Sequence, residues 1–342
     1  MKSIRSSRQV PRVLRGVLPI VAVAGIGLAV AGCGPGGAPA VAAPPASGHT
    51  AAERAAVMNW LAETSQMWTH SDFAAVDQIT TGQMRTIYRS EEPQASLPGN
   101  ASRQPFQLTN LSITIPCHSG RPAVFVAYGD TDVFDLWNGM QPAAMVFERV
   151  GGRWKLAAAL TQSGGSGWPA LCTQGTPPAT QPVVPPASYT ADLARVLTRA
   201  CTGTAETAAA ASPFAVNDFF TGPGSVNAQS ANSIRQDQRG GVSFTQRFAP
   251  GPDPTFALPL ADGRGFWVIG ILTQTGIHNA ASGLRAKAWP DGIEVAAPRP
   301  AVVHRETDTF TTTYAAIDPL PADNATVVLD GFFGWPLTAT AS

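Results

Sequence analysis

The order of helical and alternating segments repeats once along this chain, and that repeat limits the possible folds most strongly. The run Phe73–Gly82, which reads FAAVD and then TG, matches Phe214–Gly222, which reads FAVND and then TG. Pro116–Arg121 leads into one apolar strand-like run, and Pro259–Arg264, with the same Pro, Gly and Arg in order, leads into another. Both matches keep an offset of about 141 to 143 residues. The spacing indicates an ancient duplication.

Within the first copy, helical spacing gives way to strict alternation. Apolar residues at intervals near 3.6 predict a helix over 51–68, and a shorter helix is expected over 73–79, with Ser71 as its N-cap and Thr81-Gly82 at its end. A third helical piece is expected over 83–90. Antiparallel strands are predicted at 106–115, 123–130, 143–149 and 154–160, the last two joined by a hairpin turn at 150–153. Helices followed by a meander indicate an α+β fold.

The second copy follows a Pro-dense stretch that can neither continue a helix nor donate to a sheet. Its closing strands are expected at 310–317 and 325–333, after an insertion at 281–300. These patterns predict the following division of the chain: a signal peptide at 1–32, a flexible tether at 33–50, a first domain at 51–172, a linker at 173–188 and a second domain at 189–342.

The first domain carries a resemblance in its turns and hairpin. A helical layer before a curved meander looks like the NTF2/cystatin-like cone. The Pro…Gly-Arg turn, with the run Val146–Leu156 (VFERVGGRWKL) after it, is similar to an uncharacterised family of exported actinobacterial lipoproteins. The resemblance covers residues from about 51 to the C-terminus. It implies two tandem cone domains, each with N-terminal helices on a curved antiparallel sheet, and it supplies no catalytic residues.

The N-terminus reads as an export signal that ends in a lipidation site. Five basic residues precede the nearly uncharged run Val17–Val30, and Leu28–Cys33 (LAVAGC) resembles a bacterial lipobox. We therefore expect cleavage before Cys33, a diacylglycerol on its sulfur, and a protein held on the extracytoplasmic side of the cell membrane. The alternative is a retained transmembrane helix, but an apolar run of about 14 residues is short of the roughly 20 that a span needs.

The charge of the chain limits the classes of molecule that it can bind, and the number of cysteines limits the disulfides that it can form. Without the signal, the chain has 18 basic and 23 acidic residues and no cluster of three basic ones, so nucleic-acid binding is not expected. Three cysteines then remain besides Cys33, and only one pair can form within the chain. We expect Cys117 to bond to Cys172, with Cys201 free and buried; a Cys172–Cys201 bond is the competing pairing.

Signals for catalysis and metal binding are weak. No nucleophile elbow, P-loop, dinucleotide fingerprint or zinc spacing occurs, so neither a cofactor nor a metal is expected. His70, His118, His278 and His304 are interpreted as surface or loop residues. The run Asp130–Asp135 lacks the glycine and glutamate of a calcium loop and is expected to be a solvated loop.

Large aromatic residues are the remaining candidates for a binding pocket. A cone encloses space between its helices and its sheet, and such rings either line that space or fill it as core. The candidate lining residues are Trp60, Trp68, Tyr88, Phe125, Tyr128, Phe147, Phe266 and Trp267.

The expected function is a non-catalytic binding or assembly module of the cell envelope, with an envelope protein or a small apolar ligand as partner. The alternative is a small-molecule binder or enzyme that uses one open cone, with an Asp/Tyr or Asp/His pair as acid and base. An open apolar pocket that holds a carboxylate of raised pKa would favour the enzyme. A cone filled by its own aromatic side chains would favour the binding module.

Overall fold

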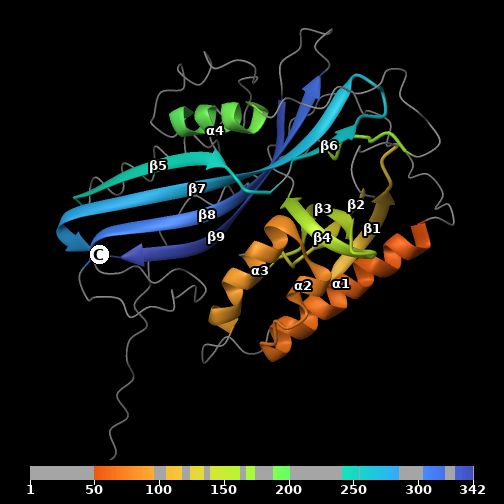
Figure 1. The fold of residues 1–342 in the computed structure, drawn as a ribbon, viewed down its shortest axis with the longest axis horizontal. Helices are drawn as coiled ribbons and strands as arrows, with labels where there is room; N and C mark the ends of the chain where they lie inside the picture. Colours follow the sequence, from red (N-terminus) through yellow and green to blue (C-terminus); the bar gives the residue numbers. More distant parts are fainter. Residues whose placement is uncertain are drawn as a thin grey trace, which may run out of the picture.

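The chain forms two antiparallel sheets with helices packed against them (Figure 1). This computed structural model describes residues 50–95, 105–117, 124–134, 139–161, 167–173, 188–200, 241–253, 255–284, 303–319 and 328–341. The predicted α+β class is confirmed. Neither sheet closes on itself: β1 and β4 are the outer strands of the first, and β5 and β9 those of the second.

The helical layer of the first half, residues 51–172, contains α1 (Thr50–His70), α2 (Val76–Ile79) and α3 (Gly82–Ala95). Ser71 does not cap α2 as predicted. It has a positive φ of 55° where α1 ends, and the Asp72 carboxylate accepts the local hydrogen bond from the Ala74 N–H at 3.0 Å. Asp72 can do this because its side-chain oxygen reaches the N–H two residues on, as in an Asx turn.

The first sheet has four strands in chain order, and its meander matches the predicted one. Gly151 and Gly152, both with positive φ, make the tight turn expected between its last two strands. Phe125 lies opposite Phe147, and the two rings stack at 4.8 Å on the face toward α1. The strands are β1 (Leu108–Thr114), β2 (Val124–Thr131), β3 (Gln141–Val150) and β4 (Arg153–Thr161).

The second half, residues 189–342, also begins with a helix and continues as an antiparallel meander. Strands β5 and β6 both pair with β7, at successive stretches of its length, so together they act as one interrupted strand. The elements are α4 (Ser188–Ala200), β5 (Val242–Pro250), β6 (Phe256–Pro259), β7 (Gly265–Leu284), β8 (Val303–Pro319) and β9 (Val328–Ala341).

Two predictions for this half need correction. The insertion expected at 281–300 begins later, because β7 continues to Leu284 and Leu284 still pairs with Val303. The closing strands are also longer than predicted. Polar threonines interrupt the apolar alternation in β8, yet cross-strand hydrogen bonding continues through them.

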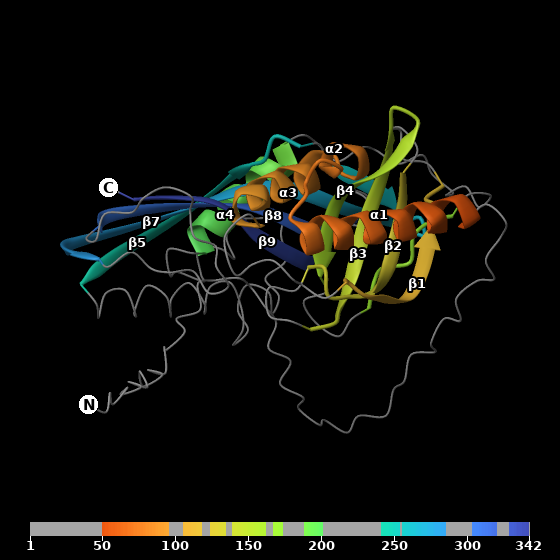
Figure 2. The same cartoon turned by 90° about the horizontal axis from the view of Figure 1, so that it is seen from below.

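One hydrophobic core of the described residues contains side chains from both halves. The first sheet packs one face on α1 and turns the other toward the second sheet, where β4 contacts β8 and β9. Trp267 of β7 is fully buried and lies 6.3 Å from the Tyr128 ring and 5.9 Å from the Trp168 ring. In Figure 2 the helices of the first half lie in front of its sheet, and the second sheet extends well beyond it.

A polar contact also joins the halves. Gln83 of α3 donates from Nε2 to the Thr311 hydroxyl at 3.2 Å and accepts from the Thr313 hydroxyl, and all three side chains are buried. The second sheet is covered on its other face by α4, where the Tyr314 hydroxyl lies 3.0 Å from that of Thr190.

Several predictions concern residues outside the described part of the chain. These are the lipidation site Cys33 with its signal and tether, the alternative span at 17–30, Cys201, the repeat segment 214–222 and most of the linker at 173–188. In the part that the structure does describe, no helix has both the length and the apolar character needed to cross a membrane.

Candidate functional site

Aromatic side chains fill the space between α1 and the first sheet. Trp60 packs edge-on against Phe147 at 6.0 Å and stacks with Phe134 at 5.9 Å, while Phe125 contacts both Phe147 and Trp154. Trp60, Phe125 and Phe147 are buried. The rings therefore pack against one another and serve as core at this position.

The other candidate lining residues are distributed over three places. Trp68 and Tyr88 line a small gap between α1, α3 and β9, and the Tyr88 hydroxyl lies 3.4 Å from that of Thr64. Tyr128 and Trp267 meet at the contact between the sheets, and Phe266 is buried on β7. The structure does not gather the eight predicted residues around one cavity.

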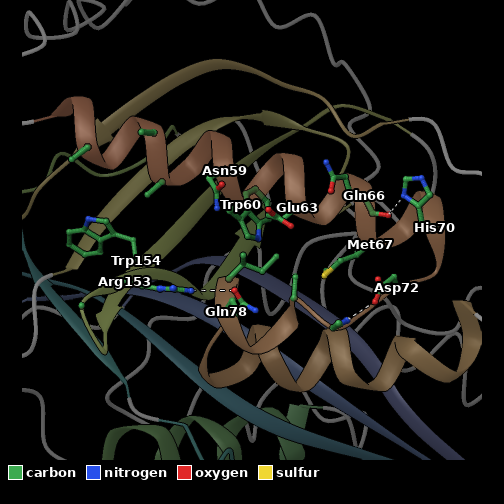
Figure 3. A pocket seen from close by; sticks show the side chains of 17 residues that line it. Asn59, Trp60, Glu63, Gln66, Met67, His70, Asp72, Gln78, Arg153 and Trp154 are labelled. Carbon is green, nitrogen blue, oxygen red and sulfur yellow. Dashed lines mark hydrogen bonds between the residues drawn. The ribbon is translucent and has the colours of Figure 1, made fainter.

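A groove lies on the outside of the helical layer and has a volume of about 720 Å³ (Figure 3). We call it the α1 groove. Helix α1 forms one wall, and α2 with the β3–β4 hairpin forms the other. Of the predicted candidates, only Trp60 contributes to it. Its lining residues are Ala52, Ala55, Ala56, Asn59, Trp60, Glu63, Gln66, Met67, His70, Asp72, Ala74, Ala75, Gln78, Ile79, Gly152, Arg153 and Trp154.

The spacing of residues along α1 explains how the groove forms. Ala52, Ala55, Ala56 and Asn59 recur at intervals of three and four, so they share one helix face. The small alanine side chains leave room above the helix backbone, and the buried Trp60 closes the floor. A wall of larger residues along this face would leave no groove.

The groove is apolar at its floor and polar along its rims. In Figure 3, Arg153 and Trp154 lie toward one end, and Gln66, His70 and Asp72 lie toward the other. Arg153 donates to the Gln78 side-chain oxygen at 3.3 Å, which joins the hairpin to α2. His70 Nδ1 lies 3.0 Å from the Gln66 carbonyl. These rims offer hydrogen-bond donors and acceptors to an occupant whose apolar parts face the alanines.

The carboxylates of raised pKa lie away from the groove. Burial raises the pKa of Asp253, against the opposing charge of Arg85, and burial also raises the pKa of Asp318. Burial likewise raises the pKa of the Tyr314 phenol to about 12. None of these three groups lines the α1 groove.

The histidine and aspartate predictions have mixed outcomes. His278 is not a surface or loop residue: β7 is long enough to include it, and the side chain is 11% exposed, with Nε2 lying 3.4 Å from the Asp308 carboxylate. The pair lies apart from the α1 groove.

Asp130 and Asp132 hold β1 by accepting hydrogen bonds, at 2.6 Å from the Asn110 amide and 2.8 Å from the Gln107 N–H. Among described residues, no cluster of three metal-binding side chains occurs. His118 and Asp135 lie outside those residues.

Cys117 and Cys172 are joined by a disulfide, with their Cα atoms 5.3 Å apart. The Cys117 N–H donates to the Cys172 carbonyl at 2.9 Å, and the Cys172 N–H donates to the Pro259 carbonyl at 2.8 Å. The disulfide therefore holds a short segment that bridges both halves.

The rim residues Asn59, Glu63, Gln66, Gln78 and Arg153 were not singled out in the sequence. One signal was available, because small and polar residues recur along α1 on the side opposite its apolar face. That signal is typical of any solvated helix. Only the placement of the hairpin beside α1 turns this face into a groove.

Comparison with known proteins covers most of the chain. Residues 43–332 match the model of a domain of unknown function (DUF8094). The chain belongs to this family. The match includes both halves and the segment between them, so one family model covers residues on both sides of the contact between the halves. No curated protein matches the chain.

Proposed function

We propose that this DUF8094 protein is a non-catalytic binding or assembly module of the cell envelope that receives its partner in the α1 groove. One observation carries the proposal: the interior of the first domain is filled by its own aromatic rings, whereas the groove outside it is open. Where the structure describes the first domain, its filled interior leaves little space for a substrate between α1 and the sheet. An open groove with polar rims suits a partner that stays partly in solvent.

Cys33 supplies the anchor in this proposal. The lipobox-like run before it and the basic and apolar segments upstream support acylation, which would place the folded halves on the extracytoplasmic face of the membrane. The lipoprotein family of actinobacteria that the sequence resembles, with its tandem NTF2/cystatin-like cones, belongs to the same proposal. In each half a described helix precedes an antiparallel meander, which supports the duplication.

The groove favours a polypeptide partner over a small apolar ligand. Its side chains alternate between apolar floor and polar rim over much of the length of α1, from Ala52 to His70. A peptide segment offers both apolar side chains and backbone hydrogen-bonding groups along such a length. The alternative, a small-molecule binder or enzyme, would need a more enclosed and convergent site.

Photo-crosslinking from α1 in living cells tests this function. Crosslinkable residues at Asn59 and Gln66 face the groove, whereas Ala62 and Thr69 are exposed on the same helix outside it. We expect one discrete protein adduct at the two groove positions and none at the two controls. Filling the groove with Ala55→Trp should abolish the adduct, while the matched Ala62→Trp should not.

Two results would overturn the proposal. Equal adducts at all four positions would mean that α1 has no selective face. A groove-dependent small molecule that co-purifies with the protein, seen by native mass spectrometry and lost in Ala55→Trp, would support the alternative instead. The anchor is tested separately by detergent-phase partitioning. If Cys33 carries the lipid, the Cys33→Ala protein should no longer partition into the detergent phase.

A further inference from the structure

The hairpin between β3 and β4 presents an apolar tip between two arginines. Val150 at the tip is 37% exposed, and Arg149 and Arg153 on either side of the turn are exposed as well. We call Arg149–Trp154 the hairpin tip. Gly151 and Gly152 have open space where a Cβ would stand, so nothing in the described structure covers the turn. Figure 2 shows this yellow-green hairpin extending past α1.

Neither arginine of the hairpin tip has an acidic partner among the described residues. Arg149 lies 6.0 Å from the centre of the Trp154 ring and donates to the Gly152 carbonyl at 3.4 Å, and Arg153 donates to the neutral Gln78 side chain. By contrast, Arg89 and Arg195 each lie within 3.1 Å of a carboxylate. The nearest acidic residue in the hairpin, Glu148, stands opposite Lys155 in the strand register. The tip therefore carries two positive charges without local compensation.

The hairpin tip also lies near the point where the proposed anchor enters the fold. Gly152, Arg153 and Trp154 line the same groove as Ala52 and Ala55 in the first turns of α1. Helix α1 begins at Thr50, so the tether predicted at 33–50 would join Cys33 to this end of the helix. A lipid on Cys33 would keep this end of the molecule close to the bilayer.

We propose that the hairpin tip docks onto an anionic lipid surface, with Val150 entering the interface and Arg149 and Arg153 contacting phosphate groups. The inference rests on the proposed lipid anchor. Valine and tryptophan beside arginine suit the boundary between headgroups and acyl chains. A zwitterionic lipid surface has no net charge, because each phosphate is balanced by a choline group, so it would attract the two arginines less strongly than an anionic surface.

A weak contact is sufficient when the protein is already tethered. Each arginine near an anionic surface strengthens binding about fivefold, so the pair contributes about 25-fold. A short flexible tether supplies an effective concentration of about millimolar, so even a contact of millimolar affinity is substantially occupied. Docking would fix the orientation of the molecule and place the α1 groove, which the hairpin partly lines, beside the membrane.

Fluorescence at the hairpin tip of the full chain tests the docking. The acylated protein is reconstituted in vesicles, with Cys201→Ser as background and an environment-sensitive label on Val150→Cys. Met140→Cys is the matched control, because Met140 is 41% exposed just before the opposite end of the same strand β3. Vesicles of phosphatidylcholine with phosphatidylglycerol are compared with vesicles of phosphatidylcholine alone.

We expect the label at position 150 to enter an apolar environment only on the anionic vesicles, and the label at 140 to remain in water on both. Arg149→Glu with Arg153→Glu should reduce the equilibrium constant for docking by about 25-fold or more, and added salt should weaken docking. Arg247→Glu with Arg264→Glu reverses two exposed charges of the second half and should have no effect.

Each remaining outcome counts against one specific claim. A protein that floats with the vesicles while its label at 150 stays in water on anionic lipid would overturn the docking and leave the anchor intact. A protein that does not float with any vesicle would overturn the anchor, and with it the proposed localisation. Equal docking of the Arg149/Arg153 variant would overturn the role of charge.

Discussion

The two sheets have the same order of strands but differ in what surrounds them. In the first sheet, β2, β3 and β4 have 8 to 10 residues, and their central residues are buried between α1 and the second sheet. In the second, β7 has 20 residues and β8 has 17, and these strands continue past the first half. The comparison shows that one repeated pattern can give a short sheet enclosed on both faces and a long sheet that is enclosed over only part of its length.

The largest expected change in unfolding free energy comes from truncating Trp267, and its form would show whether the two halves unfold as one unit. Trp267→Ala removes the buried indole that contacts Tyr128 and Trp168 across the halves, and such a truncation costs about 3–5 kcal/mol in unfolding free energy. We expect one cooperative denaturant transition, shifted as a whole. Trp154→Ala, at a half-buried hairpin position, should cost less. Two transitions, only one of them shifted, would show that the halves are independent.

The disulfide is expected to stabilise the first half and its junction with the second. Replacing Cys117 and Cys172 by alanine opens a loop with a sequence separation of 55 residues, for which the chain-entropy model gives a loss of about 4 kcal/mol. Hydrogen exchange should rise at the 170–173 segment and at Pro259–Ala261. Non-reducing peptide mapping that links Cys201 to either cysteine would contradict the pairing.

Removing the polar contact between the halves should lower the unfolding free energy by an intermediate amount. Gln83→Leu leaves the buried hydroxyls of Thr311 and Thr313 without their amide partner, which costs about 1–3 kcal/mol. Adding Thr311→Val and Thr313→Val should recover part of that loss in chemical denaturation, because no polar group is then left unpaired. Gln66→Leu, at an exposed position on α1, should change stability little. A Gln83→Leu protein as stable as the wild type would show that this contact does not stabilise the packing of the two halves.

The smallest effect concerns an ion pair within the helical layer. A hydrogen bond from Arg89, at 2.7 Å, lowers the pKa of Asp77 below its ordinary 3.8. A carboxyl whose pKa is lowered by folding stabilises the protein above pH 3.8 and loses that contribution as pH falls through the folded-state pKa. We therefore expect Asp77→Asn to reduce stability slightly at neutral pH and to have no effect at lower pH, measured by thermal denaturation. A stability difference between Asp77→Asn and the wild type that grows as the pH falls would contradict this prediction.

Much of the first half could be predicted from sequence because its elements are local. The α1 helix follows from apolar spacing, and the β3–β4 hairpin follows from Gly151-Gly152 between two alternating runs. Ser71 was assigned wrongly because serine and the neighbouring Asp72 are both good caps, and only backbone geometry separates them. The end of β7 was missed because Ser282 and Gly283, which lie where the insertion was expected, are residue types that favour turns.

The candidate site was harder to predict than the fold. Sequence reasoning named large aromatic residues because their size allows them either to line a pocket or to fill a core. The groove instead depends on small residues such as Ala52 and Ala55, which are ordinary in any helix. Nothing in their local sequence indicates that the hairpin carrying Arg153 will lie beside them, about 100 residues later in the chain.

By itself, the sequence determined the α+β class and the order of helices and strands in the first half. These depend on periodicity, turn residues and composition, which act over a few neighbouring positions. Tertiary structure alone decided that Trp267 and Tyr128 meet, that Gln83 bonds to two threonines of the other half, and that the groove lies outside the helical layer. The physical reason is that such contacts are set by how whole faces pack, and a face has no partner until the chain has folded.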